Sequence, residues 1–170
     1  MKQILLLADA DELPELTRLF WNASSDARVQ GVSTRAELDA ATQSPAPDLR
    51  LVAFCTDVIV PAAVLKRLPG PAYNVHPGPP WVRGIYPSVF ALYRGETRFG
   101  ATLHELTDKV DSGPIVALDE APITDDMDRL ALETLARSLV TNLLIRMALP
   151  LLTTDSPLPH LPNVTWVEMC

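Results

Sequence analysis

The chain has 170 residues, of which 48% are hydrophobic and 21% are charged. This composition predicts one globular domain that is large enough to bury a core. The formal net charge of −7 argues against a polyanionic partner such as nucleic acid, because binding phosphates needs clustered Lys and Arg. No apolar stretch approaches the ~20 residues of a membrane span, and the apolar run at 4–8 is too short for a secretion signal.

The two cysteines, Cys55 and Cys170, do not have the spacing of metal ligands and indicate no disulfide framework. We therefore expect a cytoplasmic protein in a reducing compartment. Nothing beside Cys55 in the sequence would activate a thiolate, so this residue is expected to be a small, buried, apolar side chain.

Strands and helices alternate along the sequence. Continuous apolar runs are typical of buried parallel strands, and apolar residues three and four apart indicate amphipathic helices. These patterns predict strands at 4–8, 29–32, 49–55, 71–76, 100–106 and 115–118, and helices at 11–21, 35–41, 61–68, 87–93 and 126–149. The order predicts an α/β fold whose twisted sheet is mostly parallel, with helices on both faces.

The last predicted helix has the clearest apolar stripe, formed by Leu132, Leu135, Leu139, Leu143 and Met147. Asp125 and Asp128 favour its N-terminus, and Pro150 is expected to end it. Three prolines follow within a short span, which indicates an extended segment. We therefore expect a single α/β domain at 1–152 and a Pro-rich C-terminal strap at 153–170.

Polar residues with complementary chemistry follow the strands of this sheet. Asn74 and His76, two residues apart, project from the same face of a strand, and Asp111 follows in an Asp-Ser-Gly-Pro turn. An amide and an imidazole can stabilise an oxyanion, and a carboxylate can hold the imidazole protonated and accept a proton. In parallel sheets such groups gather beyond the carboxyl ends of the strands, where ligands bind. The pattern therefore predicts an acyl-transfer site.

The run from Asn74 to Val116 resembles the catalytic segment of the folate-dependent formyltransferases. This family includes enzymes that act on glycinamide ribonucleotide, on methionyl-tRNA and on amino sugars. Its members have an Asn-x-His strand end, a loop closing on Gly, a Gly-x-Thr-x-His strand and an Asp-x-Gly-x-Ile/Val turn. The corresponding residues here are 74–76, the loop to Gly84, 100–104 and 111–115. With a further likeness at 52–61, the resemblance covers roughly residues 50–150.

The resemblance implies a Rossmann-like formyltransferase fold, catalytic roles for Asn74, His76 and Asp111, and 10-formyltetrahydrofolate as the formyl donor. Asp111 would raise the pKa of His76 and relay the proton of the acceptor amine, and no metal is required. The pterin is expected against the backbone of two loops, because main-chain groups can read its donors and acceptors whatever the side chains are. The residues implied for this contact are Val58, Ile59, Val60, Thr107, Asp108 and Val110.

The acceptor side is less well defined by the sequence. Arg83, Gly84 and Tyr86 are expected where the acceptor approaches, although Arg83 is equally compatible with a solvated side chain. His104 is expected either to support the catalytic residues or to be a satisfied core histidine. Residues 9–12 are acidic where family members that act on glycinamide ribonucleotide have a phosphate loop, and the basic C-terminal domain of tRNA-directed members is absent. Both of those acceptors are therefore disfavoured.

Three functions stay open at this point. The first is formyl transfer to the amine of a small metabolite, with an amino sugar among the candidates. The second is hydrolysis of the formyl-folate, in which water replaces the amine. The third is a member of the family that binds folate or a partner protein without catalysis. The sequence leaves the oligomeric state open, including a homodimer, and we expect neither a nucleic-acid nor a membrane partner.

Overall fold

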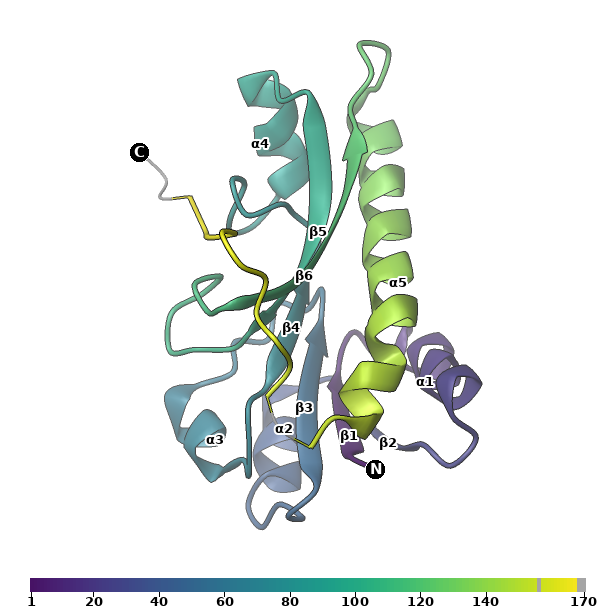
Figure 1. Cartoon of the computed structure of the whole chain (residues 1–170), viewed down its shortest axis with the longest axis vertical. Coiled ribbons are helices and arrows are strands. Elements are labelled where there is room, and N and C mark those ends of the chain that lie inside the picture. Colours follow the sequence, from purple (N-terminus) through teal and green to yellow (C-terminus); the bar gives the residue numbers. More distant parts are fainter. Residues whose placement is uncertain (156, 168–170) are drawn as a thin grey trace.

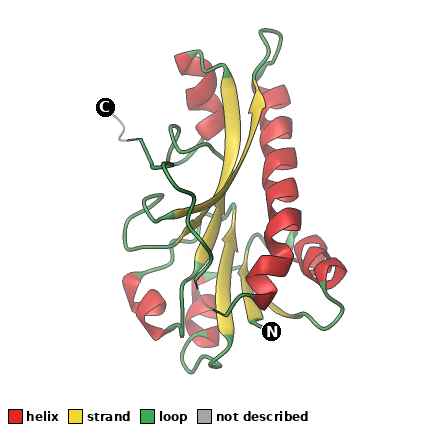
Figure 2. Ribbon diagram, viewed as in Figure 1, coloured by secondary structure: helices red, strands yellow, loops and turns green. Residues whose placement is uncertain are grey.

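The computed structural model describes residues 1–155 and 157–167, which form the α/β fold drawn in Figures 1 and 2. Strands and helices alternate as the apolar patterns predict. In chain order the elements are β1 (Gln3–Leu7), α1 (Leu13–Ala23), β2 (Arg28–Val32), α2 (Arg35–Ala41), β3 (Leu49–Phe54), α3 (Ala62–Arg67), β4 (Tyr73–His76), α4 (Pro87–Arg94), β5 (Arg98–Glu105), β6 (Ile115–Pro122) and α5 (Arg129–Thr153).

The strands of the described chain form one sheet in the order β2-β1-β3-β4-β5-β6. The first four strands pair in parallel, which confirms the prediction for the first half. β5 and β6 add antiparallel strands at the other end. β6 begins at Ile115, where the sequence predicts the start of the final strand, and runs to Pro122 because the polar residues Asp119 and Glu120 still pair with β5.

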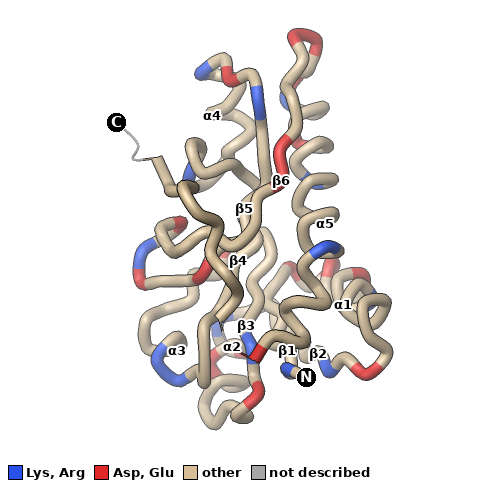
Figure 3. Tube along the Cα trace, in the orientation of Figure 1, with Lys and Arg blue, Asp and Glu red and all other residues tan. Residues whose placement is uncertain are grey.

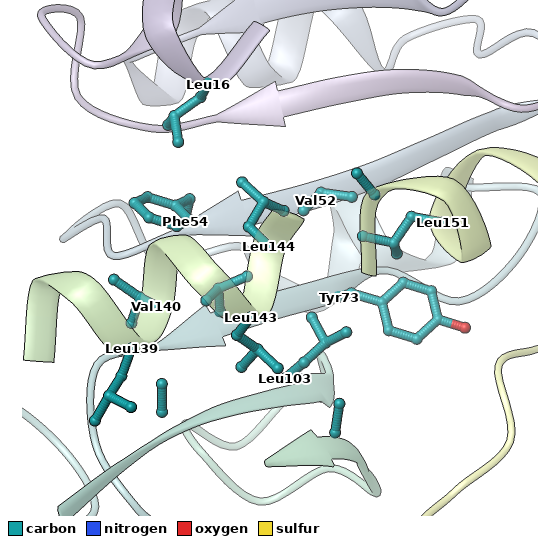
Figure 4. Packing of buried hydrophobic residues seen from close by; sticks show 14 of the residues in the cluster. Leu16, Val52, Phe54, Tyr73, Leu103, Leu139, Val140, Leu143, Leu144 and Leu151 are labelled. Atoms are coloured by element: carbon teal, nitrogen blue, oxygen red, sulfur yellow. The ribbon is translucent and has the colours of Figure 1, made fainter. Parts of the chain in front are cut away.

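Two hydrophobic clusters lie on the two faces of the sheet. The larger cluster joins the sheet to α1, α4 and α5. Figure 4 shows side chains of α5, among them Leu143 and Leu144, between Val52, Tyr73 and Leu103 from three different strands. The smaller cluster joins β1 and β3 to Leu38 of α2 and Val64 of α3. Helices therefore cover both faces, as predicted.

The long helix α5 corrects the sequence-based expectation for its C-terminal end. Pro150 does not end the helix but lies inside it, and the helix continues to Thr153. The last turn persists because Leu151 and Leu152 are fully buried and because the Arg50 guanidinium donates to the carbonyl oxygens of Leu151 at 2.6 Å and Thr154 at 2.8 Å. These bonds satisfy carbonyls that have no partner within the helix.

The same helix is long and apolar enough to cross a membrane by length and composition, which the sequence analysis did not expect. Half of its most apolar window is buried against the rest of the fold. Its buried residues belong to the larger cluster, which is the arrangement of a core helix.

The short strand β4 connects the core to the opposite face. Tyr73 and Val75 are fully buried in the cluster beneath α5. Because side chains alternate along a strand, Asn74 and His76 project to the other face. The alternation therefore delivers both polar residues to the face away from α5, at the carboxyl end of the parallel strands.

Candidate active site

Polar side chains from β4, β5 and the loop between β5 and β6 meet on this face. Asn74 pairs directly with His104 across the antiparallel ladder, and His76 pairs with Thr102. Asp111 lies in the loop and has a positive φ of 44°, a conformation that non-glycine residues rarely adopt. Such strain persists only where the surroundings enforce it, and here the Gly84 N–H donates to the Asp111 carboxylate at 2.9 Å.

The Asp111 carboxylate lies between two histidines. Its Oδ2 is 3.6 Å from His76 Nδ1, and its Oδ1 is 3.4 Å from His104 Nε2. The Asn74 amide nitrogen is 3.2 Å from His104 Nε2. Asp111, His76 and His104 are all nearly inaccessible to solvent, at 5%, 5% and 1% exposure. The structure thus brings the three predicted catalytic residues together and adds His104, which is both buried and part of the polar network.

Burial controls the protonation of this cluster. The desolvation of His76 lowers its pKa, and this effect outweighs the opposing attraction of Asp111. Burial alone would raise the pKa of Asp111, but the contacts with His104, His76 and the Gly84 N–H outweigh it and lower that pKa. Asp111 does raise the pKa of His76, as expected, but burial opposes this effect and is larger, so the pKa is lowered overall. Burial therefore favours the neutral form of the imidazole.

Both ring nitrogens of His76 nevertheless face oxygen acceptors. Nε2 is 3.3 Å from the Val82 carbonyl oxygen, and Nδ1 faces Asp111. An imidazolium has two N–H donors, so each N–H of a protonated ring would face one of these two oxygen atoms. Gly78 makes this placement feasible, because a Cβ there would lie 2.6 Å from Nε2.

Next to these residues lies a cavity of about 530 Å³, within the range typical of small-molecule sites. Asn74, His76 and Asp111 form part of its wall. All the residues that the resemblance implies for pterin binding also line it: Val58, Ile59, Val60, Thr107, Asp108 and Val110. The site has the size and the two flanking loops that a flat heterocycle with many donors and acceptors needs.

The residues predicted for the acceptor side have separate positions. Gly84, at φ +82°, and Tyr86, at φ 54°, line the cavity, and Tyr86 is 68% exposed. Arg83 does not belong to the cavity wall. Its guanidinium donates to the Val110 carbonyl oxygen at 3.0 Å. Cys55 lines the cavity, and burial raises its pKa to about 12, which excludes a reactive thiolate near neutral pH.

One residue near the site was missed by the sequence analysis. Trp166 of the C-terminal segment packs edge-on against His104 and His76, with ring centroids 4.9 Å and 5.9 Å away. Trp81, in the loop after His76, packs against the core cluster beneath α5. No local pattern marks Trp166, since its partners are far away in the sequence.

Comparison with known proteins identifies the family and the fold. The formyl transferase family model matches residues 17–147. The chain belongs to the formyl transferase family. A 51-residue stretch is 47% identical to the dTDP-4-amino-4,6-dideoxyglucose formyltransferases of Mycobacterium bovis and Mycobacterium tuberculosis. That match covers 29% of this chain but only 21% of the relatives' own length.

Solved structures of formyl transferases share the fold. A sugar N-formyltransferase from a Shewanella species superposes with a TM-score of 0.73 at 15% identity, over 94% of this chain and 76% of that one. An N-formyltransferase from Helicobacter canadensis, in complex with folinic acid and dTDP-3-aminofucose, gives 0.75 at 12% identity, over 98% and 70%. A formyltetrahydrofolate deformylase from Pseudomonas syringae gives 0.70 at 18% identity, over 87% and 60%. The Rossmann-like formyl transferase fold is thereby established.

Proposed function

We propose that this chain transfers the formyl group of 10-formyltetrahydrofolate to the amine of a small metabolite, with amino sugars as the preferred acceptor class. The observation that carries the proposal is the convergence of Asn74, His76 and Asp111 on the wall of one cavity. The 47% identity to formyltransferases of a nucleotide-linked amino sugar supports the acceptor class.

The surroundings of His76 indicate how the residues would act. Attack of the amine on the formyl carbon forms a C–N bond and releases a proton. Asp111 and His76 lie where they can accept that proton, because the two ring nitrogens of His76 lie 3.6 Å from the Asp111 carboxylate and 3.3 Å from the Val82 carbonyl oxygen. The Asn74 amide has a second N–H that can stabilise the oxyanion, an effect worth about 3 kcal/mol in other acyl-transfer sites. The same residues return the proton to the leaving folate nitrogen as its bond to the formyl carbon breaks.

The donor is proposed to lie in the cavity with its pterin against Val58–Val60 and the turn from Thr107 to Val110. The backbone of these loops supplies the recognition, as the sequence analysis expects.

We also retain as proposals the division into a domain at 1–152 and a strap at 153–170, a cytoplasmic location and a homodimer. Figure 3 shows Lys, Arg, Asp and Glu scattered over the elements in this view, which supports a small-molecule acceptor over a nucleic acid.

The decisive measurement is the release of tetrahydrofolate from 10-formyltetrahydrofolate, with and without a panel of amines that includes nucleotide-linked amino sugars. We expect slow release alone and a large acceleration by the right amine, because a transferase gains nothing from admitting water. A reduced folate should bind with micromolar affinity or better, about 8 kcal/mol. Fast release of formate that no amine accelerates would favour the hydrolase, and absence of folate binding would reject the donor.

A further inference from the structure

The described part of the C-terminal strap crosses the sheet and reaches the candidate site at Trp166. After α5 and Asp155, residues 157–167 of the described chain contain no Lys, Arg, Asp or Glu. The Leu158 N–H donates to the Tyr73 hydroxyl at 3.0 Å, and the Leu161 N–H donates to the Ile115 carbonyl of edge strand β6 at 2.7 Å. The Val167 N–H donates to the Pro80 carbonyl at 3.0 Å. Figure 1 shows this segment crossing in front of the sheet.

Trp166 is fixed at the end of this path by contacts of different kinds. Its indole N–H donates to the Gly113 carbonyl oxygen at 2.8 Å. The Arg83 guanidinium lies over its ring, 5.7 Å from the centroid. The ring then meets His104 and His76 edge-on, with interplanar angles of 88° and 67°. The side chain belongs to neither hydrophobic cluster, so its place is on the polar network and not in the core.

The histidines need a cover at this position. They project from the face of β4 and β5 that is turned away from α5, and the clusters show α2 and α3 packing on β1 and β3. Even so, His76 and His104 are 5% and 1% exposed. The Trp166 indole lies against both rings on this face.

We propose that Trp166 is a positioning residue that excludes water from His76 and thereby directs the formyl group to an amine and not to water. The inference rests on the proposed formyl transfer. In transfer, the bond from formyl carbon to folate nitrogen breaks, a C–N bond to the amine forms, and the amine proton moves to the folate nitrogen. In hydrolysis, water supplies the oxygen and the proton and formate is released. Both reactions use the same residues, so access of water to His76 decides between them.

Two substitutions distinguish the effect of the Trp166 ring from the effect of its hydrogen bond to Gly113. Trp166→Ala removes the indole, whereas Trp166→Phe keeps an aromatic ring but loses the N–H bond to Gly113. Trp21→Ala is the matched control, because Trp21 lies on α1 and is 54% exposed. Each variant is first compared with the wild type by circular dichroism and thermal unfolding, which identifies any variant that fails to fold.

The first readout is the titration of the His76 ring by NMR of histidine-labelled protein without any ligand. The charged or titratable groups that face His76 are Asp111, His104 and Arg83, and all three are unchanged in these variants. Trp166→Ala should raise the pKa of His76, because water reaches the ring and burial is the largest cause of its lowering. Trp166→Phe should give an intermediate value, and Trp21→Ala should give that of the wild type.

The second readout is the ratio of formate to formylated amine made from 10-formyltetrahydrofolate. We expect this ratio to rise roughly ten-fold in Trp166→Ala, less in Trp166→Phe, and not at all in Trp21→Ala. An unchanged His76 titration together with an unchanged ratio in a folded Trp166→Ala protein would overturn the inference. If that variant does not fold, the same comparison is decided by Trp166→Phe.

Failure of the proposed function gives a different result. A wild-type protein that neither binds nor uses the formyl donor would remove the second readout and reject formyl transfer. The His76 titration would still show whether Trp166 shields the ring, because it needs no ligand. A shift of that pKa without any catalysis would support the shielding and reject the role in partitioning.

Discussion

The Asp111 carboxylate is the residue on which the polar network converges. It accepts the Gly84 N–H and faces both histidines from a backbone conformation with positive φ. A side chain of the same size without charge would keep the packing but could neither stabilise a protonated imidazole nor accept a proton. Its contribution can therefore be tested without opening a cavity.

Asp111→Asn should lower turnover by about 100-fold or more while the protein stays folded, because proton transfer is lost and the shape is kept. Steady-state kinetics with the best amine acceptor, together with thermal unfolding, provide the measurement. Asp26→Asn, at an exposed turn, is the matched control and should retain full turnover. Near wild-type turnover in Asp111→Asn would contradict the assigned role.

Protonation of His76 should also be visible in the stability of the empty protein. The folded-state pKa of His76 is lowered, so between that value and the ordinary pKa of about 6.5 the unfolded chain binds more protons. The free energy of unfolding should therefore fall as pH drops from 7 through this window. His76→Gln should flatten this fall, as measured by urea unfolding at a series of pH values.

At the scale of elements, the C-terminal end of α5 depends on a side chain from another strand. Pro150 lacks an N–H, yet the helix continues for three more residues. The buried Arg50 of β3 donates to two carbonyls of this last turn. The element is thus completed by a contact between residues about a hundred positions apart.

Arg50→Met should destabilise the protein by about 2 kcal/mol, because two carbonyl oxygens lose a charged donor. Only the part-buried carbonyl of Thr154 could readily form a hydrogen bond with water instead. Chemical unfolding measured by fluorescence or circular dichroism tests this value. Arg129→Met, which removes an exposed arginine paired with Glu133 near the other end of the helix, should have a much smaller effect on stability. Equal effects of the two substitutions would show that the capping contact is unimportant.

At the scale of the whole molecule, α5 holds the parallel and antiparallel parts of the sheet together. Its residues pack against β3, β4 and β5 in one cluster, as Figure 4 shows. Leu144 is fully buried in this cluster, whereas its neighbour Ile145 is 52% exposed. The two positions offer a comparison of burial within one turn of one helix.

Leu144→Ala should lower the free energy of unfolding by about 2–5 kcal/mol, the range for a large-to-small change in a packed core. Ile145→Ala should lower it by less than about 1 kcal/mol, because its side chain already contacts water. Both values follow from urea unfolding curves. Similar losses at the two positions would mean that the helix packs differently from the described arrangement.

Most elements of this fold could be predicted from the sequence because their burial follows simple periods. Apolar runs marked the parallel strands, and the i, i+2 spacing placed Asn74 and His76 on one face. Local rules failed where tertiary contacts decide. Arg50 keeps α5 helical beyond Pro150, and burial lowers the pKa of His76 despite the neighbouring Asp111. The contact of Trp166 with the histidines depends on the path of a segment that has no periodic pattern.

The alternation in β4 has a consequence for how this sequence can change in length. Its four residues place Tyr73 and Val75 against α5 and Asn74 and His76 toward the cavity. Insertion or deletion of a single residue before His76 would exchange the two sets, placing an imidazole in the hydrocarbon core and a valine in the site. Length variation should therefore be confined to the flanking loops, such as residues 77–83, where an added residue leaves the strand register unchanged.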